Sequence, residues 1–234
     1  MNTIGVLGGM GPEATILLQR KLVEAVPAED DGDHIPLLID MNPQVPSRIA
    51  HLIERKGKDP GPVLAAMARR LQNAGATALA MPCNTAHHYA GAITDAVDIP
   101  LLNMIELAAE RATKELGERG CVGILASPAV RHIRLFETAL EKRGFTVIWP
   151  EQNDQMLAAI KAIKVGGSCE NARTTLRDAS ADLLTRGADL QIVACSEFSI
   201  IADSIASNVR AIDTVDLLVS AMIEFSKTLK SRAR

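Results

Sequence analysis

Aromatic residues are scarce in this chain of 234 residues. They make up 3% of it, with one tryptophan, one tyrosine and four phenylalanines. Proteins that stack the bases of single-stranded nucleic acids need more aromatic side chains than this. An excess of one charge is also lacking, since 25 basic and 28 acidic residues give a net charge of −3. We therefore expect neither a nucleic acid nor an anionic membrane surface as a partner.

Long hydrophobic runs and paired cysteines are missing as well. No apolar stretch approaches the roughly 18 residues that span a bilayer, and the opening MNTIGVLGGMG is not typical of a signal peptide. The four cysteines show no C-x-x-C spacing, which argues against a disulfide frame or a zinc ribbon. These absences predict a cytoplasmic globular protein with reduced thiols.

Short apolar runs alternate with segments of helical period along the whole chain, a pattern typical of α/β folds with parallel sheets. Pro12 suits the first turn of a helix, whose apolar side would hold Ile16, Leu17, Leu22 and Val23. A second helix through Val63, Met67, Leu71 and Ala74 would end at Gly75. The expected strands are Thr3–Gly8, Pro36–Ile39, Thr77–Met81, Pro100–Leu102, Cys121–Leu125, Thr146–Ile148, Gln191–Ala194 and Arg210–Ile212.

A weak internal repeat divides the chain into halves. IGVLG at residues 4–8 resembles VGILA at 122–126, the segment around Cys83 resembles that around Cys195, and PLLN at 100–103 resembles RAID at 210–213. The three matches keep one order at a spacing of about 110–118 residues. We expect two similar, pseudo-symmetric α/β domains with parallel sheets: residues 1–104 plus 213–234 with Cys83, and residues 105–212 with Cys195. The active site would lie in the cleft between them, at the carboxyl ends of the strands.

Cys83 and Cys195 occupy equivalent positions of this repeat, each at the end of a strand and before a helical segment (86–97 after Cys83). A single cysteine in such a place is usually a small buried hydrophobe, and we interpret Cys121 and Cys169 in that way. Two thiols on opposite sides of a cleft suit the inversion of a carbon, because one takes a proton from one face while the other returns a proton to the opposite face. With a free pKa of about 8.5, a thiol needs only a modest shift to do either.

Four motifs in the expected order resemble the aspartate/glutamate racemase superfamily, and aspartate racemases most closely. They are GGMGPEAT (8–15), NPQVPSR (42–48), MPCNTAH (81–87) and CSE (195–197), and they cover essentially the whole chain. The resemblance implies racemisation of aspartate, and of glutamate more weakly, without PLP, metal or any other cofactor, by a homodimer. It also implies that Cys83 serves the D-enantiomer and Cys195 the L-enantiomer.

The same motif matches assign substrate contacts. Asn84, Thr85 and Ser127 resemble binders of the α-carboxylate, Arg48 resembles the reader of the side-chain carboxylate, and Lys164 matches a lysine near the site. Further contacts are implied for four residues: Met10, Gln44, Ser196 and Glu197. Two positions depart from the family pattern, Ser47 where many aspartate racemases have aspartate, and Ser196 where threonine is usual. The loss of a charge at Ser47 leaves the side-chain specificity open.

Other interpretations compete with this one. Maleate isomerases and hydantoin racemases of the superfamily also keep paired cysteines, and a dicarboxylate-binding protein would keep Arg48. Residues 9–14 satisfy the dinucleotide fingerprint G-x-G-x-x-A, but the acidic residue expected about 20 positions later is poorly supplied. Cys83 and His87 could share a metal with His88 or His132, although no further cluster of ligands lies nearby. In place of a dinucleotide site, we expect the glycines of residues 9–14 to let backbone amides approach a small carboxylate.

Overall fold

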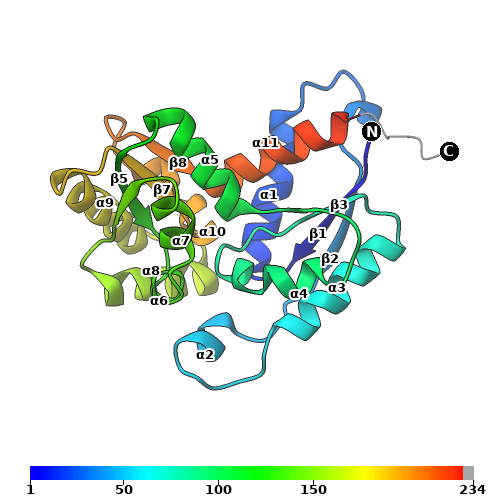
Figure 1. Ribbon diagram of the computed structural model, residues 1–234, viewed down its shortest axis with the longest axis horizontal. Helices are drawn as coiled ribbons and strands as arrows, with labels where there is room; N and C mark the ends of the chain where they lie inside the picture. Colours follow the sequence, from blue (N-terminus) through cyan, green and yellow to red (C-terminus); the bar gives the residue numbers. More distant parts are fainter. Residues whose placement is uncertain (229–234) are drawn as a thin grey trace.

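A computed structural model describes residues 1–228, in which eight strands form two parallel four-stranded sheets (Figure 1). The first sheet has the order β2-β1-β3-β4 and the second the order β6-β5-β7-β8. The strands are β1 Ile4–Gly8, β2 Leu37–Met41, β3 Ala78–Ala80, β4 Leu101–Leu102, β5 Gly120–Leu125, β6 Phe145–Ile148, β7 Leu190–Val193 and β8 Ala211–Asp213. Each lies within one or two residues of the run that predicted it.

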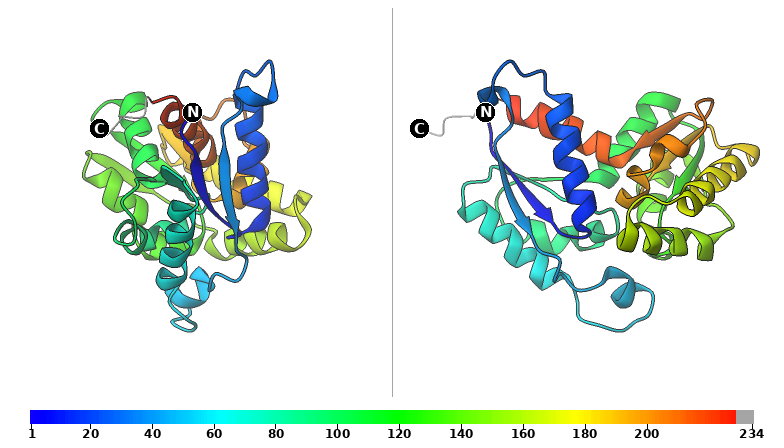
Figure 2. Two further views of the ribbon diagram at one scale, coloured as in Figure 1. Left: turned by 90° about the vertical axis from the view of Figure 1, so that its right-hand side faces the viewer. Right: turned by 180° about the vertical axis from the view of Figure 1, so that it is seen from behind.

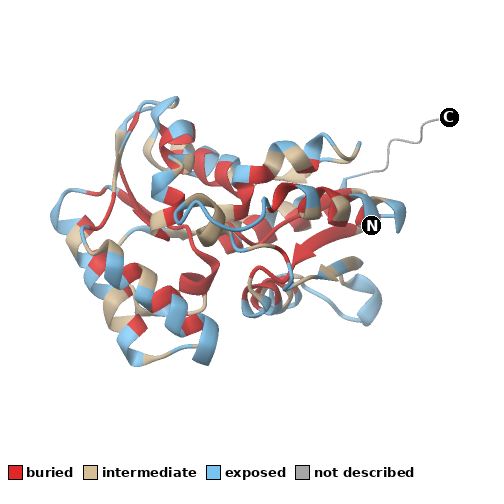
Figure 3. Ribbon diagram, turned by 90° about the horizontal axis from the view of Figure 1, so that it is seen from below, coloured by how far each residue is buried: buried red, intermediate tan, exposed pale blue. Residues whose placement is uncertain are grey.

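Helices connect the strands and cover both sheets, as parallel pairing requires. The α-helices are α1 Pro12–Ala25, α2 Arg48–Leu52, α3 Gly61–Asn73, α4 Ala90–Thr94, α5 Met104–Leu116, α6 Pro128–His132, α7 Leu135–Glu141, α8 Asn153–Gly166, α9 Glu170–Thr185, α10 Ser196–Ser199 and α11 Thr214–Lys227. Three 3-10 helices are η1 Asp31–Asp33, η2 Thr85–Tyr89 and η3 Ala202–Ser204. Seen from below, the strands are largely buried between helices whose outer faces are exposed (Figure 3).

The two sheets have the same strand order, so the internal repeat corresponds to two similar α/β units. β1, β3 and β4 of the first unit match β5, β7 and β8 of the second. Even the helix caps repeat: the Asn103 side chain accepts from the N–H of Ile105 at the start of α5, and that of Asp213 accepts from the N–H of Val215 at the start of α11. The predicted fold of two pseudo-symmetric α/β units is confirmed.

Local signals in the sequence explain several helix ends. Pro12 is the first residue of α1, and Gly75, with φ of +103°, follows the end of α3. The predicted apolar side of α1 is partly wrong: Leu17 and Leu22 are buried, whereas Ile16 and Val23 are 53% and 57% exposed. The strip of α1 that packs on the sheet is rotated relative to our prediction.

The helices α5 and α11 contact each other and run between the two units (Figures 1 and 2). α5 follows the first sheet but contributes Ala108 and Ala112 to the apolar cluster that contains Val122 of the second. α11 follows the second sheet and packs Val215, with other apolar residues, into a cluster that contains Ile4. The domain boundaries at 104/105 and 212/213 stay a prediction, and residues 229–234 of the first predicted domain lie outside the described residues.

In the part of the chain that the structure describes, no helix is long and apolar enough to cross a membrane.

Candidate active site

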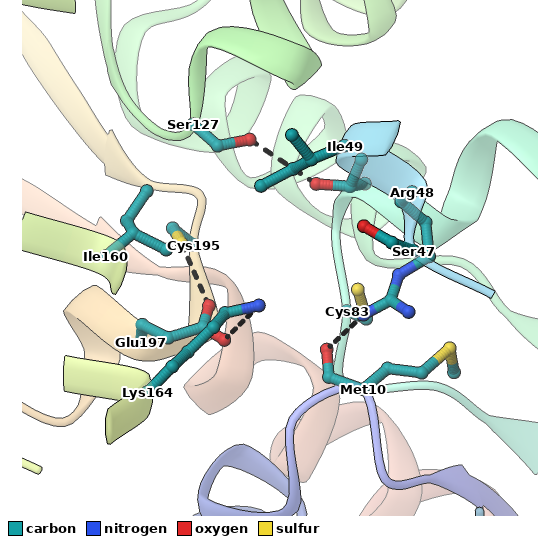
Figure 4. A pocket seen from close by; sticks show the side chains of 11 residues that line it. Met10, Ser47, Arg48, Ile49, Cys83, Ser127, Ile160, Lys164, Cys195 and Glu197 are labelled. Carbon is teal, nitrogen blue, oxygen red and sulfur yellow. Dashed lines mark hydrogen bonds and ion pairs between the residues drawn. The ribbon is translucent and has the colours of Figure 1, made fainter. Parts of the chain in front are cut away.

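Both predicted cysteines follow strands at the centre of their sheets, Cys83 after β3 and Cys195 after β7. Both are free thiols and only 7% exposed. They line one pocket, to which the two units contribute from opposite sides (Figure 4). The residues around it are Met10, Ser47, Arg48, Ile49, Cys83, Thr85, Ser127, Ile160, Lys164, Cys195 and Glu197.

The pocket gathers most of the predicted site residues. Met10, Arg48, Thr85, Ser127, Lys164 and Glu197 line it together with the two cysteines. Gln44 is exposed, Asn84 and Ser196 are buried, and the lining includes none of the three. Ile49 and Ile160 were missed by sequence reasoning, because an isoleucine carries no chemical signature and only its place in the fold brings it to a site.

His87 holds the backbone of the Cys83 segment. The prediction of one helix over 86–97 is wrong: a tight turn (Cys83 N–H to Met81 O, 2.8 Å) leads into η2 and the short α4. His87 Nδ1 lies 2.9 Å from the carbonyl oxygen of Cys83, and its Nε2 accepts from the N–H of Met104 at 3.1 Å. Because Nε2 accepts, the neutral ring carries its proton on Nδ1 and donates it to Cys83. Burial lowers the pKa of His87 to about 4.

These two hydrogen bonds bear on the metal interpretation. A histidine ligand needs a free ring nitrogen for the ion, and both nitrogens of His87 are bound to backbone groups. Within residues 1–228, no three His, Cys, Asp or Glu side chains are grouped as a metal site would require. His87 therefore acts as a backbone support for the Cys83 loop.

Cys195 lies in a different electrostatic environment. It directly precedes the short helix α10, and its Sγ donates to Glu197 Oε2 at 3.1 Å. Burial raises the pKa of the Cys195 thiol well above its usual value, and the adjacent Glu197 carboxylate raises it further. Cys195 is therefore held as a protonated thiol with an acidic partner.

Glu197 also pairs with Lys164, whose Nζ lies 3.2 Å from Glu197 Oε1 (Figure 4). Burial acts to lower the pKa of Lys164, but the Glu197 carboxylate, with smaller contributions from Cys83 and Cys195, holds it above its ordinary value. Lys164 is therefore a cation at the pocket wall, and Glu197 connects it with the Cys195 thiol.

Arg48 is the first residue of α2. Ser47 caps this helix, since its hydroxyl accepts from the N–H of Ala50 at 3.2 Å. The Arg48 guanidinium donates to the carbonyl oxygens of Met10 (3.1 Å), Pro46 (3.1 Å) and Val45 (3.3 Å). Three of its five N–H groups are used in this way. The remaining donors leave Arg48 able to bind a carboxylate.

Two hydroxyls meet across the pocket from opposite units. Thr85 in η2 and Ser127, the cap of α6 after β5, have oxygens 3.5 Å apart. A carboxylate oxygen that lies beside this pair could accept from both. Asn84, by contrast, donates its side-chain nitrogen to Thr214 Oγ1 at 2.9 Å, and its contact with the substrate stays a prediction.

The glycines near the N-terminus have a packing role. A Cβ on Gly9 would lie 2.4 Å from the carbonyl carbon of Asn42, and Gly9 has φ of +90°. Its N–H donates to Thr15 Oγ1 at 3.0 Å, so the Gly9 amide is already used within the protein. These contacts explain Gly9 without any dinucleotide. The approach of a small carboxylate to the other amides of this segment stays a prediction.

Comparisons with known proteins show which family and which solved structures the chain is similar to. A family model described as Asp/Glu/Hydantoin racemase matches residues 7–222. The broad-specificity amino-acid racemase RacX of Bacillus subtilis is 26% identical over 94% of this chain and 96% of its own length. The aspartate racemase of Picrophilus torridus is 27% identical and superposes with a TM-score of 0.86, covering 97% of this chain and 94% of the other. An aspartate racemase homologue of Pyrococcus horikoshii (20% identity, TM-score 0.75, 97% and 100% covered) shares the fold.

Proposed function

The chain belongs to the Asp/Glu/Hydantoin racemase family, and we propose that it racemises acidic amino acids, aspartate foremost and glutamate more weakly, without a cofactor. It is an isomerase of the racemase type. In the proposed reaction Cys83 and Cys195 are the two bases. The observation that carries the proposal is that these thiols line one pocket from opposite units.

The proton transfers balance between the two sulfurs. A thiolate on one side takes the α-proton, and the electron pair of the broken C–H bond spreads onto the α-carboxylate. The thiol on the opposite side then gives its proton to the other face of the carbon and becomes the thiolate. The enzyme after one turnover has therefore exchanged the protonation states of its two cysteines, and the reverse reaction starts from there.

The surroundings of Cys195 support a protonated resting state for this thiol. Cys195 donates to Glu197, with burial and this carboxylate both raising its pKa. It is therefore suited to start as the acid, with Cys83 as the base. By the family resemblance Cys83 acts on the D-enantiomer, so the resting enzyme would be able to deprotonate D-aspartate.

Acidic substrates fit the charges of the pocket. Arg48 and Lys164 supply two cations and Glu197 one anion. A guanidinium can bind a side-chain carboxylate with paired hydrogen bonds, while Thr85 and Ser127 can donate to the α-carboxylate. Donors on that carboxylate stabilise the charge that develops as the proton leaves. A relative named for aspartate and one named for broad specificity are consistent with an amino-acid substrate.

The test is racemisation of single enantiomers by protein dialysed against EDTA and free of PLP, followed by the optical activity of aspartate. We expect conversion of D- and L-aspartate, and slower conversion of glutamate. Activity that disappears on dialysis and returns with PLP or zinc would contradict the two-thiol mechanism.

We also expect a cytoplasmic homodimer. The outer sides of α1 and β2 expose Ile16, Val23, Ile39 and Met41, apolar residues that a second copy could cover. Light scattering at micromolar concentration should give twice the chain mass of 25.0 kDa.

A further inference from the structure

A single buried hydroxyl connects the loop that carries Cys83 with the strand that leads to Cys195. Thr214 Oγ1 donates to the carbonyl oxygen of Val193 at 3.0 Å and accepts from Asn84 Nδ2 at 2.9 Å. Asn84 directly follows Cys83, and only Ala194 separates Val193 from Cys195. The hydroxyl therefore lies between the two thiol-bearing segments and is bound to both.

The bridge is inaccessible to water. Thr214 is 0% exposed, Val193 1% and Asn84 2%. The one hydroxyl proton is used on Val193, so Thr214 can only accept from Asn84, which fixes the amide with its nitrogen toward Thr214. If the hydroxyl were removed, the Asn84 amide and the Val193 carbonyl would each lose a partner that solvent could not replace.

The backbone on either side of Thr214 is anchored, on one side to the second unit and on the other to the first. Thr214 is the first residue of α11 and directly follows β8, which pairs with β7 in the second sheet. The next residue, Val215, is buried among apolar residues of the first unit such as Val6. The hydroxyl is thus carried by a backbone segment anchored on each side.

Other bonds hold each cysteine within its own unit. The carbonyl oxygen of Cys83 accepts from His87, and that of Cys195 accepts from the N–H of Ser199 at 3.0 Å. These contacts fix a loop relative to its own sheet. The Thr214 hydroxyl, in contrast, fixes the Cys83 loop relative to the end of β7.

We propose that Thr214 is a positioning residue that sets the spacing of the Cys83 and Cys195 thiols. The proposal rests on the proposed function in one respect, because racemisation needs both thiols within reach of one carbon. A misplacement of about 1 Å can cost a reaction about a hundredfold. A reaction that needs only one thiol should be far less sensitive to the spacing.

The first experiment uses that difference. Elimination from 3-chloroaspartate needs one base: a thiolate takes the α-proton, chloride leaves with its bonding electrons, and the enamine product hydrolyses to oxaloacetate and ammonia. Thr214→Val should lower kcat for aspartate racemisation about tenfold to a hundredfold and leave elimination within about threefold. Thr214→Ser, which keeps the hydroxyl, should restore racemisation.

The matched control is Ser180→Ala. Ser180 is 1% exposed and donates to Gln191 Oε1 at 2.7 Å, so its loss also leaves a buried amide oxygen without its donor, but Ser180 is not part of the pocket lining. Thermal unfolding of both variants measures their loss of stability. An unchanged ratio of racemisation to elimination in Thr214→Val would overturn the proposal, as would an equal fall of this ratio in Ser180→Ala.

A second experiment does not depend on catalysis. In a Cys121→Ser/Cys169→Ser background, a short bis-methanethiosulfonate should join Cys83 to Cys195, and intact-mass spectrometry separates one bridging reagent from two single ones. We expect Thr214→Val, or the smaller Thr214→Ala if the valine variant does not fold, to reduce the bridged fraction severalfold, and Thr214→Ser to keep it. Equal bridging in all of them would overturn the proposal. A wild-type protein that bridges in this Thr214-dependent way without racemising aspartate would refute the proposed function alone.

Discussion

The thiol of Cys195 donates a hydrogen bond to the carboxylate of Glu197 over 3.1 Å, and the other oxygen of that carboxylate lies 3.2 Å from Lys164 Nζ. Cys83, the second thiol of the pocket, instead shares the pocket wall with Arg48 of α2, and its backbone carbonyl oxygen is bound by His87. The two thiols thus occupy equivalent places in the fold and chemically different surroundings.

Glu197→Gln should make Cys195 more reactive toward alkylation near neutral pH. The Glu197 charge raises the pKa of the thiol, so its loss should lower that pKa and increase the thiolate fraction at a given pH. Lys164, released from its partner, would act in the same direction. The measurement is the pH dependence of iodoacetamide labelling, resolved by peptide mass spectrometry so that Cys83 serves as the internal comparison. A labelling profile of Cys195 that does not move would contradict this role of Glu197.

Arg48→Leu should lower kcat/KM for aspartate by a factor that corresponds to about 2–4 kcal/mol of lost transition-state stabilisation, as expected for loss of a charge-assisted pair in a desolvated site. A substrate without a side-chain carboxylate, such as alanine, should be affected much less. Arg20→Leu, at an exposed arginine that pairs with Glu24, is the control. If kcat/KM fell equally for the two substrates, the role of Arg48 would be to hold the three backbone carbonyls that it binds. Lys164 would then become the candidate for binding the side-chain carboxylate.

His87 should make the protein sensitive to acid. Its pKa is about 4 in the folded protein, against about 6.5 in the unfolded chain. Protonation therefore favours the unfolded state, and the stability that neutral His87 provides is lost as the pH falls from about 6.5 toward 4. Relative to His87→Asn, the wild type should lose about 3 kcal/mol of unfolding free energy between pH 7 and pH 4.

Denaturant titrations at several pH values check this difference. The comparison with the variant is needed because Asp213 acts in the opposite direction: burial raises its pKa to about 6, so its contribution is present in acid and decreases as the pH rises through 6. Parallel pH profiles of wild type and His87→Asn would show that the histidine titrates normally.

Sequence reasoning predicted the strands and the two cysteines because these depend on short-range signals. Apolar runs that end at glycines or prolines marked β1 and β3, and the repeated strand–cysteine pattern placed Cys83 and Cys195 at equivalent strand ends. Contacts between distant segments could not be derived in this way. The Thr214 bridge joins residues 130 positions apart, and nothing in the sequence around Asn84 indicates that its amide donates to Thr214.

Helix limits were harder for a different reason. The segment after Cys83 has helical composition, yet two hydrogen bonds of His87 and the turn at Met81 divide it into η2 and α4. Likewise, the period of α1 predicted an apolar side but not its rotation, which left Ile16 and Val23 exposed. Tertiary contacts decided both cases.

The central claim is that Cys83 and Cys195 are two bases on opposite faces of one carbon. The most direct measurement compares Cys83→Ser and Cys195→Ser in two reactions of single enantiomers: racemisation of aspartate, and elimination from 3-chloroaspartate. Both variants should lose racemisation in both directions, because a serine hydroxyl is too weak a base to substitute. Cys83→Ser should still eliminate from the L-enantiomer and Cys195→Ser from the D-enantiomer. Racemisation that survives in either variant, or elimination from the same enantiomer by both, would contradict the account.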